Sequence, residues 1–549
     1  MRICSLLALV AGLFLGTAAN GTPGDTVRSI NAPSRYIIGL AFDGKYLWSS
    51  DRRTNLLYEI DPSSGKCLDS FSSPGYGISG LTFDGKWLWC VDPEAALLYA
   101  VDLKTRLTER TINSPTAQAA GIAWDGKYLW LVDDAANKVC QIDPTDGTTI
   151  VSLPAPTSQC GALTFDGKYL WVSDRYTNKI YMMTPDGGDV IIILDAPGQY
   201  ASGLAWDGKN LWVADYQADK CFQLVVDDGV QFSQRDRRSE NMEFVHQVYN
   251  FGPDTVTDVN VFLAVPHDLS SQKLLGKITF DPEPKEIVKD KWGQEVARYE
   301  FTNIGANQHT DVSMKVREEM YRTRYYVFPD RVGKLEEIPS DIRKQYLVDD
   351  VKFSYHSPVI QDAVKASVGT ETNPYWIGRK IFRYVIDHMT YELSGGWNTA
   401  PTVLARGTGS CSEYTFVYIA MCRAAGLPAR YVGAVSWRDD DASWDDVHHR
   451  WVEIYLPNYG WIPVDPSGGD NPWPANQANA IGFIDNRFLI TTFGGGGSEY
   501  LDWNYDANER WVSKGKCKIV VRSFGEWTPG AQNPEEFGSA TKSGECAPK

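Results

Sequence analysis

The chain has 549 residues, 43% of them hydrophobic, which is enough for three or four domains with buried cores. Its formal net charge of −16 excludes the nucleic-acid-binding classes, which present basic surfaces. After the first 20 residues no stretch approaches the roughly 18 apolar residues of a membrane span, so we expect no transmembrane segment.

Residues 1–19 have the pattern of a secretory signal peptide. Arg2 precedes an apolar run from Leu6 to Leu15, and the small residues Thr17-Ala18-Ala19 follow. We expect cleavage after Ala19. The mature protein is therefore predicted to be secreted or periplasmic.

Cysteine usage predicts disulfide bonds. Cys4 lies in the leader, so nine of the ten cysteines remain after cleavage. An odd number in an oxidising compartment is typical of several disulfides plus one free thiol. Cys411 is the candidate free thiol, and Cys517 with Cys546 is a candidate pair.

Residues 22–230 contain five copies of the repeat G-[LI]-[AT]-[FW]-D-G-K-x-L-W-x-x-D, with one extra residue at the start of the fourth copy. The first aspartate of the repeat recurs every 41 residues, at Asp43, Asp84, Asp125, Asp166 and Asp207. A period near 40 residues with several short strands per unit predicts β-propeller blades. Each Asp-Gly predicts a two-residue type I′ hairpin turn, because such turns need positive φ.

The ends of the repeats predict the number of blades. The fourth strand is missing after the last copy, but a strand precedes the first copy at residues 26–30. We therefore expect a five-bladed propeller that the N-terminal strand completes. The repeats resemble secreted propellers with the DGKxLW signature, a group that includes plant-type glutamine cyclotransferases. Residues shared by all blades are expected to be structural, so we predict a binding platform here and not a second enzyme.

Residues 231–338 alternate between apolar and polar positions in short runs bounded by glycine and proline. This pattern predicts the strands of an immunoglobulin-like β-sandwich without catalytic residues. Helical periodicity follows at residues 357–368. A second helix is predicted from a cap at Asn373-Pro374 to about Met389.

A glycine-rich loop leads into an apolar helix at Cys411. Gly407 and Gly409 precede this cysteine, apolar residues then recur three and four positions apart, and Gly426 with Pro428 ends the helix. A cysteine in the first helical turn meets unpaired N–H groups and the positive end of the helix dipole, which favour the thiolate. Cys411 is therefore the candidate nucleophile.

A predicted hairpin supplies partners for this thiol. Strands are expected at residues 449–455 and 461–465. In the register of a five-residue loop, Asp465 lies diagonal to His449 on one face, within reach of a hydrogen bond. A slip of one residue would move the carboxylate to the other face. The neighbouring His448 is a rival, but its side chain points to the opposite face.

The motifs G-x-G-x-C-x-E, H-x-W-x-E and W-x-P-V-D-P, in this order, resemble the transglutaminase-like cysteine hydrolase superfamily. The resemblance implies an α+β, papain-like catalytic domain at residues 339–510. It implies Cys411 as the nucleophile, His449 as the general base and acid, and Asp465 as the residue that orients the imidazole.

Other residues near these motifs have weaker claims. The backbone N–H of Cys411 is the expected oxyanion donor. By the same resemblance Trp397 is a candidate oxyanion or substrate contact, with core packing as the alternative. Glu413 is expected to be a helix-start carboxylate. Arg450 departs from the family, which usually has a small residue after the histidine.

Three later stretches carry further expectations. The acidic run at residues 439–446 has enough carboxylates for Ca²⁺, but a solvated loop is the preferred interpretation. The glycines at 494–497 are expected to form a flexible loop over the cleft. Residues 511–549 are expected to form a last strand and a flexible tail.

These features predict a secreted, multidomain thiol enzyme without a cofactor. It would act on carboxamide or peptide bonds of a protein or peptide substrate through an acyl-thioester, by hydrolysis or transamidation. The propeller would bind the substrate or a cell-envelope or extracellular partner. The alternative is a non-enzymatic, propeller-based binding or scaffold protein with a relic catalytic domain.

Overall fold

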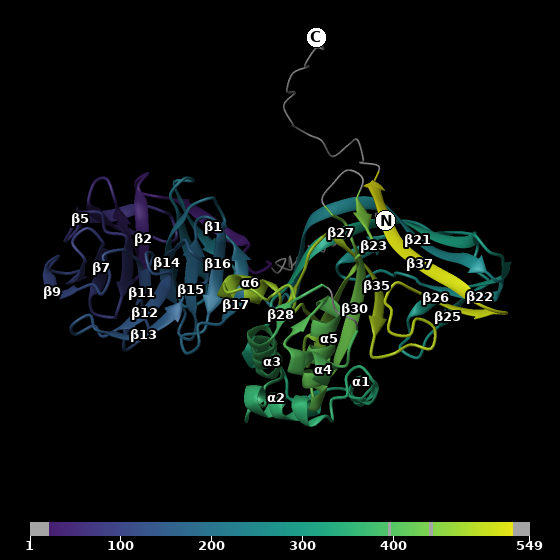
Figure 1. Ribbon diagram of the computed structural model, residues 1–549. Coiled ribbons are helices and arrows are strands. Elements are labelled where there is room, and N and C mark those ends of the chain that lie inside the picture. Colours follow the sequence, from purple (N-terminus) through teal and green to yellow (C-terminus); the bar gives the residue numbers. More distant parts are fainter. Residues whose placement is uncertain (1–20, 394–396, 439–442, 531–549) are drawn as a thin grey trace, which may run out of the picture.

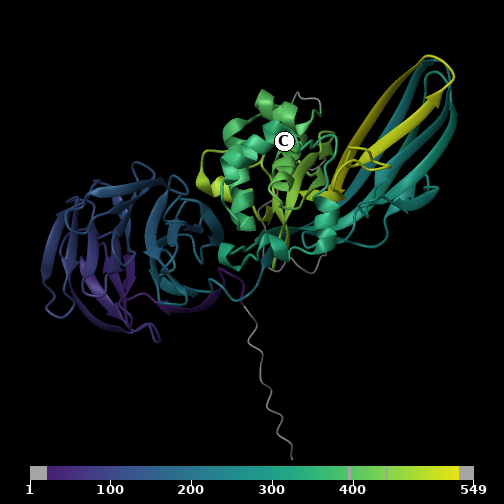
Figure 2. The ribbon, with the colours of Figure 1, turned by 90° about the horizontal axis from the view of Figure 1, so that it is seen from below.

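The computed structural model describes residues 21–393, 397–438 and 443–530. The predicted signal peptide lies outside the described residues. Figures 1 and 2 show three regions in a row, with helices in the middle. We call them the sheet array (residues 26–224), the helical region (residues 340–494) and the two-sheet region (residues 232–325 with 507–529). Within the described chain, no helix is long and apolar enough to cross a membrane.

The sheet array consists of twenty short strands. Their bounds are β1 (Thr26–Asn31), β2 (Ile37–Phe42), β3 (Leu47–Asp51), β4 (Leu56–Ile60), β5 (Cys67–Ser72), β6 (Gly80–Phe83), β7 (Leu88–Asp92), β8 (Leu97–Val101), β9 (Thr108–Asn113), β10 (Ala119–Trp124), β11 (Leu129–Asp133), β12 (Lys138–Ile142), β13 (Thr149–Pro154), β14 (Cys160–Phe165), β15 (Leu170–Asp174), β16 (Lys179–Met183), β17 (Val190–Asp195), β18 (Ala201–Trp206), β19 (Leu211–Asp215) and β20 (Lys220–Leu224). They form five antiparallel four-stranded sheets, one for each repeat copy.

The N-terminal strand belongs to the fifth sheet, as the sequence predicts, because β1 pairs antiparallel with β20. The first strands of successive sheets approach closely. A Cβ atom added to Gly121 would lie 2.4 Å from the carbonyl oxygen of Gly161, and one added to Gly203 would lie 2.5 Å from that of Ile38. Glycine is therefore required where these backbones meet, and the fifth sheet lies against the first.

The Asp-Gly turns differ from the predicted two-residue type I′ turn. The Asp43 N–H donates to the carbonyl of Tyr46, so the turn spans four residues, and only Gly44 among them has positive φ, 96°. The Asp43 carboxylate accepts the N–H groups of Lys45 and Tyr46 and the indole N–H of Trp48. The aspartate side chain, and not a tight backbone turn, holds the loop.

The two-sheet region contains the longest strands of the molecule (Figure 1). Its strands are β21 (Phe232–Pro253), β22 (Val256–Ala264), β23 (Gln272–Leu274), β24 (Thr279–Asp281), β25 (Glu286–Lys289), β26 (Glu295–Ile304), β27 (Gln308–Tyr325), β36 (Ala507–Ser513) and β37 (Cys517–Pro529). Two short strands from the chain of the helical region, β31 (Trp444–Asp445) and β34 (Phe483–Ile484), join one of its sheets. One sheet has the order β23-β27-β21-β37-β31, with β24 and β34 also on β27, and the other has the order β25-β26-β22-β36. Buried residues of both sheets, such as Phe244 and Val259, form one core.

The C-terminal strands correct the predicted boundaries. β36, which the sequence did not predict, pairs with β22, and β37 pairs with β21. Trp527 of β37 is 1% exposed and belongs to the core of the two-sheet region. Residues 511–529 are therefore part of that region and not a separate strand and tail. The predicted tail beyond residue 530 lies outside the described residues.

The helical region surrounds one four-stranded sheet of order β33-β32-β30-β35. Its elements, with two preceding 3₁₀ turns, are η1 (Pro329–Arg331), η2 (Leu335–Glu337), α1 (Ser340–Tyr346), α2 (Pro358–Val368), α3 (Pro374–His388), β28 (Thr390–Tyr391), α4 (Ala400–Arg406), β29 (Thr408–Gly409), α5 (Cys411–Ala424), β30 (Ala429–Ser436), β32 (His449–Leu456), β33 (Gly460–Val464), α6 (Pro474–Asn479) and β35 (Phe488–Gly494). The helices predicted at 357–368 and after Asn373 are present, and the Asn373 side chain caps α3.

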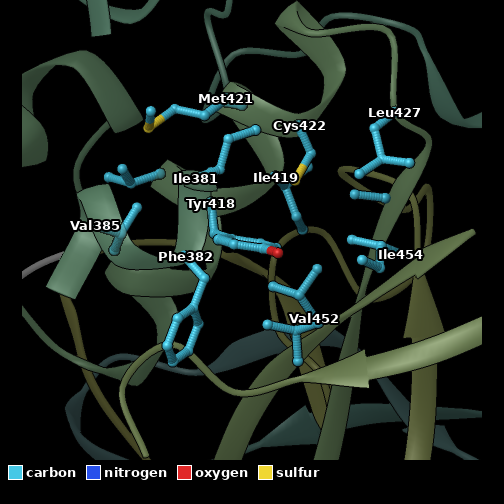
Figure 3. Packing of buried hydrophobic residues seen from close by; sticks show 14 of the residues in the cluster. Ile381, Phe382, Val385, Tyr418, Ile419, Met421, Cys422, Leu427, Val452 and Ile454 are labelled. Atoms are coloured by element: carbon cyan, nitrogen blue, oxygen red, sulfur yellow. The ribbon is translucent and has the colours of Figure 1, made fainter. Parts of the chain in front are cut away.

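Helix α5 lies between α3 and the sheet (Figure 3). Residues 411–423 of this helix are all buried. Figure 3 shows Ile419 and Cys422 facing Leu427 and Ile454, with Ile381 of α3 on the other side. The core thus fixes the position and direction of α5, and with them the position of Cys411 at its start.

The glycines at residues 494–497 do not form the predicted flexible loop over a cleft. The Gly495 carbonyl accepts a hydrogen bond from the buried Arg423, and a Cβ atom added to Gly495 would lie 2.4 Å from the Trp292 ring. Since Trp292 belongs to the loop between β25 and β26, these glycines allow the helical region to pack against the two-sheet region.

The helical region also contacts the sheet array. Asp189, between β16 and β17, lies 2.7 Å from Arg383 of α3, and the Ala475 N–H of α6 donates to the Pro156 carbonyl. The chain connects the sheet array to the helical region only through the two-sheet region, so these contacts join distant parts of the sequence.

The expected disulfides are absent from the described residues. All eight described cysteines are free, and most of them are buried in the sheet array or in α5. Cys517 is free as well, but its candidate partner Cys546 lies outside the described residues. Cys411 is therefore one of several free thiols. Only its surroundings can make it more reactive than the other cysteines.

Candidate active site

Cys411 is the first residue of α5, where the helix dipole is positive. It is 6% exposed. The Glu413 carboxylate accepts the Ser410 N–H at 3.3 Å and lies 2.7 Å from Arg406 Nη2. Glu413 is thus the expected helix-start carboxylate, and these bonds hold the loop that precedes the cysteine.

The hairpin of β32 and β33 places His449 and Asp465 on the same face. Tyr455 pairs with Trp461, which is the register that the sequence predicts. His449 Nε2 lies 2.8 Å from Asp465 Oδ2. The one-residue slip that would have separated the two side chains has not occurred.

Cys411 and the His449 ring lie close enough for each to shift the pKa of the other. Because Nε2 is occupied by Asp465, Nδ1 is the nitrogen available to the thiol. Burial alone raises the pKa of Cys411, but the nearby His449, with a further contribution from Arg450, lowers this pKa by more than burial raises it, so the net shift is downward. Burial alone lowers the pKa of His449, but the charge of Asp465 and its hydrogen bond outweigh burial and raise it. Both shifts favour a thiolate–imidazolium pair.

The second oxygen of Asp465 is also held. Oδ1 accepts the Ser467 hydroxyl at 2.9 Å and the Gly468 N–H at 2.9 Å. Burial raises the pKa of Asp465, but the charge of His449 and these hydrogen bonds give a net lowering. The carboxylate is therefore oriented from both sides and stays ionised near His449.

His448 is not an alternative to His449 in this geometry. Its Nδ1 lies 2.6 Å from Asp506 Oδ2, and its ring packs near Phe244 and Tyr505. The side chain thus points toward the two-sheet region, away from the face that carries His449 and Asp465, as the sequence predicts.

Trp397 lies in a packing environment. Its ring centroid is 6.1 Å from that of Tyr505 and 5.1 Å from Arg450 Cζ, and its carbonyl accepts a hydrogen bond from Lys352. These contacts agree with the alternative of core packing, and they place the ring beside the residue that follows His449.

The burial of Arg450 is the feature of the site that sequence reasoning missed. Its side chain is 0% exposed, and Nη2 donates to the Trp503 carbonyl at 2.5 Å. Strand alternation in β32 sends residues 450, 452 and 454 toward α5, so the signal was a cation at an inward position of an apolar strand. The departure from the family pattern is therefore a buried charge next to the candidate nucleophile.

A cavity of about 240 Å³ borders the candidate triad on the Asp465 side. Trp451 and Phe488 form its apolar wall, and Asn476 and Asp485 contribute polar groups. Of the three candidate residues, Asp465 lines this cavity, and Cys411 and His449 do not.

The calcium alternative finds no support in the described residues. Asp439, Asp440 and Asp441 lie outside them, and Asp445 pairs with Arg438 and accepts the Ser436 N–H. Across the described ranges there is no group of three or more His, Cys, Asp or Glu residues arranged to hold a metal ion.

Comparison with known protein families places a transglutaminase-like domain in this chain. Residues 361–466 match the transglutaminase-like superfamily. The match begins in α2 and ends just after Asp465, so it includes the three candidate residues.

Curated relatives cover parts of the chain. An uncharacterized protein of Haemophilus influenzae is 27% identical over 164 residues, which are 24% of this chain and 44% of that protein. The uncharacterized protein YebA of Bacillus subtilis is 24% identical over 28% of this chain and 21% of its own length. The chain thus spans less than half of these two relatives. An uncharacterized protein of Mycobacterium bovis, Mb2599c, is 22% identical over 44% of this chain and 77% of its own length.

Solved structures show only distant likeness. A candidate cysteine protease from Cytophaga hutchinsonii has a TM-score of 0.38 and 15% identity, over 53% of this chain and 92% of that one. Glutaminyl cyclase from Myxococcus xanthus has a TM-score of 0.34 and 15% identity, over 37% of this chain and 96% of that one. TM-scores this low do not establish a shared fold.

Proposed function

We propose that this protein is a thiol enzyme in which Cys411, His449 and Asp465 form a catalytic triad acting on carboxamide or peptide bonds. The main support is the 2.8 Å bond between His449 and Asp465 beside a thiol at a helix N-terminus. The transglutaminase-like match over residues 361–466 supports the same class of chemistry.

In this proposal the Cys411 thiolate attacks the carbonyl carbon of the substrate and a tetrahedral oxyanion forms. The C–N bond breaks when the His449 imidazolium protonates the leaving amine, which leaves a thioester on Cys411. Water or a second amine then attacks the thioester, gives its proton to His449 and restores the thiolate. Asp465 keeps the imidazole oriented and favours its protonated form.

The backbone N–H of Cys411 is the proposed oxyanion donor, because N–H groups of the first helical turn have no partner within the helix. Trp397 remains a proposed second contact, with its packing against Arg450 as the competing role. Whether water or an amine takes the acyl group depends on which one reaches the thioester, so hydrolysis and transamidation are both included in the proposal.

We further propose that the five sheets form a five-bladed propeller that binds the protein or peptide substrate, or an extracellular partner. The pairing of β1 with β20 and the close approach of the first strands support a closed ring. Export through cleavage of residues 1–19 belongs to the same proposal. Mass spectrometry of the protein recovered from its source would test the export, since cleavage leaves Asn20 as the first residue.

Thiol alkylation tests the enzyme proposal. Wild-type protein is treated with limiting iodoacetamide near pH 7, and the labelling rates of Cys411 and of the more exposed Cys517 are followed by peptide mass spectrometry. We expect Cys411 to react faster although it is buried, and His449→Ala to slow only Cys411, since the imidazolium stabilises the thiolate.

A screen of labelled glutamine peptides, with and without a primary amine, then compares wild type with Cys411→Ala. Turnover that disappears in Cys411→Ala would establish the activity and its direction. Labelling of Cys411 no faster than that of Cys517, with no effect of His449→Ala, would instead favour a binding protein with a relic domain.

A further inference from the structure

A cavity of about 570 Å³ opens at the centre of the sheet array. It lies on the side where the first strand of every sheet begins and the second strand of every sheet ends. All five sheets contribute to it. Cavities of roughly 300–1,000 Å³ are typical of small-ligand sites. Its lining is independent of the candidate triad, so it needs an explanation of its own.

Two arginines at this cavity are held by tyrosines. Arg53 Nη1 donates to the Tyr36 hydroxyl at 2.9 Å, with Cζ 5.1 Å from the ring centroid. Arg175 Nη1 donates to the Tyr200 hydroxyl at 3.0 Å, with Cζ 5.9 Å from the ring centroid. A guanidinium has five N–H donors, and each of these two uses few of them within the protein. Both groups are therefore held in one orientation and still have N–H donors for a ligand.

The charge of the cavity opposes that of the chain. Arg52 also lines it, and the carboxylate among its described lining residues is Asp134. In the described chain no ion pair joins Arg52, Arg53 or Arg175 to a carboxylate. Three cations against one anion form a positive site in a protein of net charge −16, which favours an anionic ligand.

The floor of the cavity is mostly apolar. Ile38, Ala119 and Ala201 lie there, and the hydroxyls of Ser79 and Ser202 donate to backbone carbonyls. A ligand rich in hydroxyl groups would find few polar partners on this surface. A flat apolar group would instead lie on the small residues and the tyrosine rings.

We propose that this cavity binds a carboxylate attached to a flat apolar group, with the carboxylate at one of the two tyrosine-held guanidinium groups, Arg53 or Arg175. The C-terminal end of a peptide whose last residue is aromatic has this chemistry, and so does a free aromatic acid. The inference deepens the proposed binding role of the sheet array and does not depend on the thiol chemistry.

Fluorescence anisotropy tests this with the full chain carrying Cys411→Ala, which prevents turnover. The probe is fluorescein-labelled Gly-Gly-Ala-Ala-Phe with a free C-terminus, compared with its C-terminal amide. We expect the amide to bind at least about tenfold more weakly, since a charge-assisted bond to a guanidinium is lost. Arg53→Ala with Arg175→Ala should weaken the acid by a similar factor. Arg106→Ala, an exposed arginine paired with Asp69, is the matched control and should bind as the parent.

Unlabelled N-acetylphenylalanine distinguishes the two sources of the carboxylate. Displacement at concentrations similar to those of the peptide means that a free acid suffices, and binding of the peptide alone means that the chain end is recognised. Equal affinity for acid and amide would overturn the proposal. So would the absence of binding by both peptides and the acid at about millimolar concentration.

A different observation carries a second inference, at Arg450. Its Nε and Nη1 atoms are buried and have no hydrogen-bond partner among the described residues. Four rings surround the guanidinium, with centroids 4.1 to 5.2 Å from Cζ, namely Trp397, Phe416, Tyr431 and Tyr505. A buried cation without a paired anion is strongly destabilising, so its presence implies a counter-charge that forms during function.

The ionisable groups that face Arg450 from its surroundings are few. Tyr431 on β30, Tyr505 and Asp506 after β35, and Cys411 on α5 act on its charge. Asp506 already pairs with His448. Burial raises the pKa of Tyr431 to about 12, so its hydroxyl stays neutral. Burial also raises the pKa of Tyr505.

Arg450 lies against the first turns of α5, because its guanidinium packs on the Phe416 ring and its carbonyl accepts the Thr415 hydroxyl at 3.5 Å. Cys411, at the start of the same helix, is therefore the group that becomes an anion near Arg450. We propose that Arg450 is a positioning residue that supplies the buried counter-charge for the Cys411 thiolate. This inference rests on the proposed function. Together with His449 it would keep the sulfur anionic and fix its direction, while the aromatic rings exclude water.

The test compares Arg450→Met with Arg450→Lys by the alkylation rate of Cys411 across pH. We expect Arg450→Met to slow labelling at pH 7 by at least about tenfold and to move the pH midpoint upward, because a cation near the thiolate is lost. Arg450→Lys should restore part of the rate. Urea unfolding of Arg450→Met should be unchanged or need more urea, since removing a lone buried charge is not destabilising.

The outcomes separate this inference from the proposed function. Fast labelling of wild-type Cys411 that Arg450→Met leaves unchanged would overturn the counter-charge and keep the enzyme proposal. Slow labelling of Arg450→Lys equal to that of Arg450→Met would mean that shape and not charge matters, which also overturns it. If Arg450→Met does not fold, Arg450→Gln, which can still donate to the Trp503 carbonyl, takes its place in the comparison.

Discussion

In the sheet array the same polar contact occurs five times, whereas in the helical region the central polar contact occurs once. Each copy of the repeat bonds an aspartate to an indole N–H five residues later, from Asp43 with Trp48 to Asp207 with Trp212, at 2.8 Å in every copy. The bond from His449 to Asp465 joins the first residue of β32 to the residue that follows β33, and it has no equivalent in the array.

This comparison distinguishes contacts that stabilise the fold from contacts that are candidates for catalysis. A local bond that recurs in every copy stabilises each unit in the same way, so no single copy is special. A unique cluster of ionisable groups with shifted pKa values lies at one point and is a candidate for function. Four predictions follow from this contrast, in order of expected effect.

Cys411→Ala should abolish turnover, with a loss of at least about 10³-fold, because the nucleophile of a triad cannot be replaced by its partners. Steady-state turnover of a glutamine or peptide substrate measures this. Cys517→Ala, which removes a partly exposed thiol outside the candidate site, should leave turnover unchanged. Activity of Cys411→Ala within about tenfold of wild type would show that this thiol is not the nucleophile.

Asp465→Asn should reduce turnover by about 10²- to 10⁴-fold, because the imidazole loses its orienting charge. The reactive form needs Cys411 deprotonated and His449 protonated. Activity therefore rises as pH passes the lowered Cys411 pKa and falls as pH passes the raised His449 pKa. Without the carboxylate charge the His449 pKa falls, so the alkaline limb of the pH–rate profile should move to lower pH.

Glu453→Gln is the control for that prediction. Glu453 lies on the same face of β32 and pairs with Arg430 at 2.6 Å, so this variant removes a carboxylate away from His449. Its alkaline limb should stay in place. A shift of equal size in Glu453→Gln would show that overall charge, and not the bond to Asp465, sets the His449 pKa.

The strands at the two chain ends should contribute unequally to stability. Trp527→Ala in β37 should destabilise the two-sheet region by about 3–5 kcal/mol, because a large buried ring is lost. Ile30→Ala in β1 should cost the sheet array about 2 kcal/mol, near the low end for such truncations, because the rest of β1 is exposed. Hydrogen exchange of each region under mild urea measures both, and a larger loss for Ile30→Ala would reverse the expected order.

The smallest effect is expected in the repeats. Asp84→Ala and Asp166→Ala should each destabilise the sheet array by about 1–2 kcal/mol, in the lower part of the range for a buried polar group left unpaired, because each leaves a buried indole N–H without its acceptor. The two values should agree, since both carboxylates accept the same three bonds. Hydrogen exchange would show the difference if one copy had a role of its own.

Sequence reasoning was most successful where the signal was local or repeated. The helix after Cys411 and the hairpin register at Tyr455 and Trp461 follow from spacing alone. The register mattered most, because it decided whether Asp465 could reach His449. The prediction of a two-residue Asp-Gly turn was wrong, because the aspartate carboxylate holds a longer loop by binding its backbone N–H groups. Side-chain and backbone acceptors compete for these N–H groups, and the outcome decides the turn type.

The other expectations that failed depended on distant contacts. No periodicity shows that β37 will pair with β21, which lies more than two hundred residues earlier in the chain. The glycines around Gly495 suggested a mobile loop, but Trp292 and Arg423 pack on them. Arg450 was visible as an unusual residue, yet its burial among aromatic rings depends on four separate elements of the fold.

By itself, therefore, the sequence determined the repeat of the sheet array, the helix that starts at Cys411 and the order of the candidate triad. These follow from periodicity, caps and strand alternation, which act over a few residues. The 2.8 Å approach of His449 to Asp465, the burial of the Arg450 cation and the pairing of β37 with β21 arise only in the folded chain. Those features arise when remote segments bury their apolar faces together, and no local pattern encodes which segments meet.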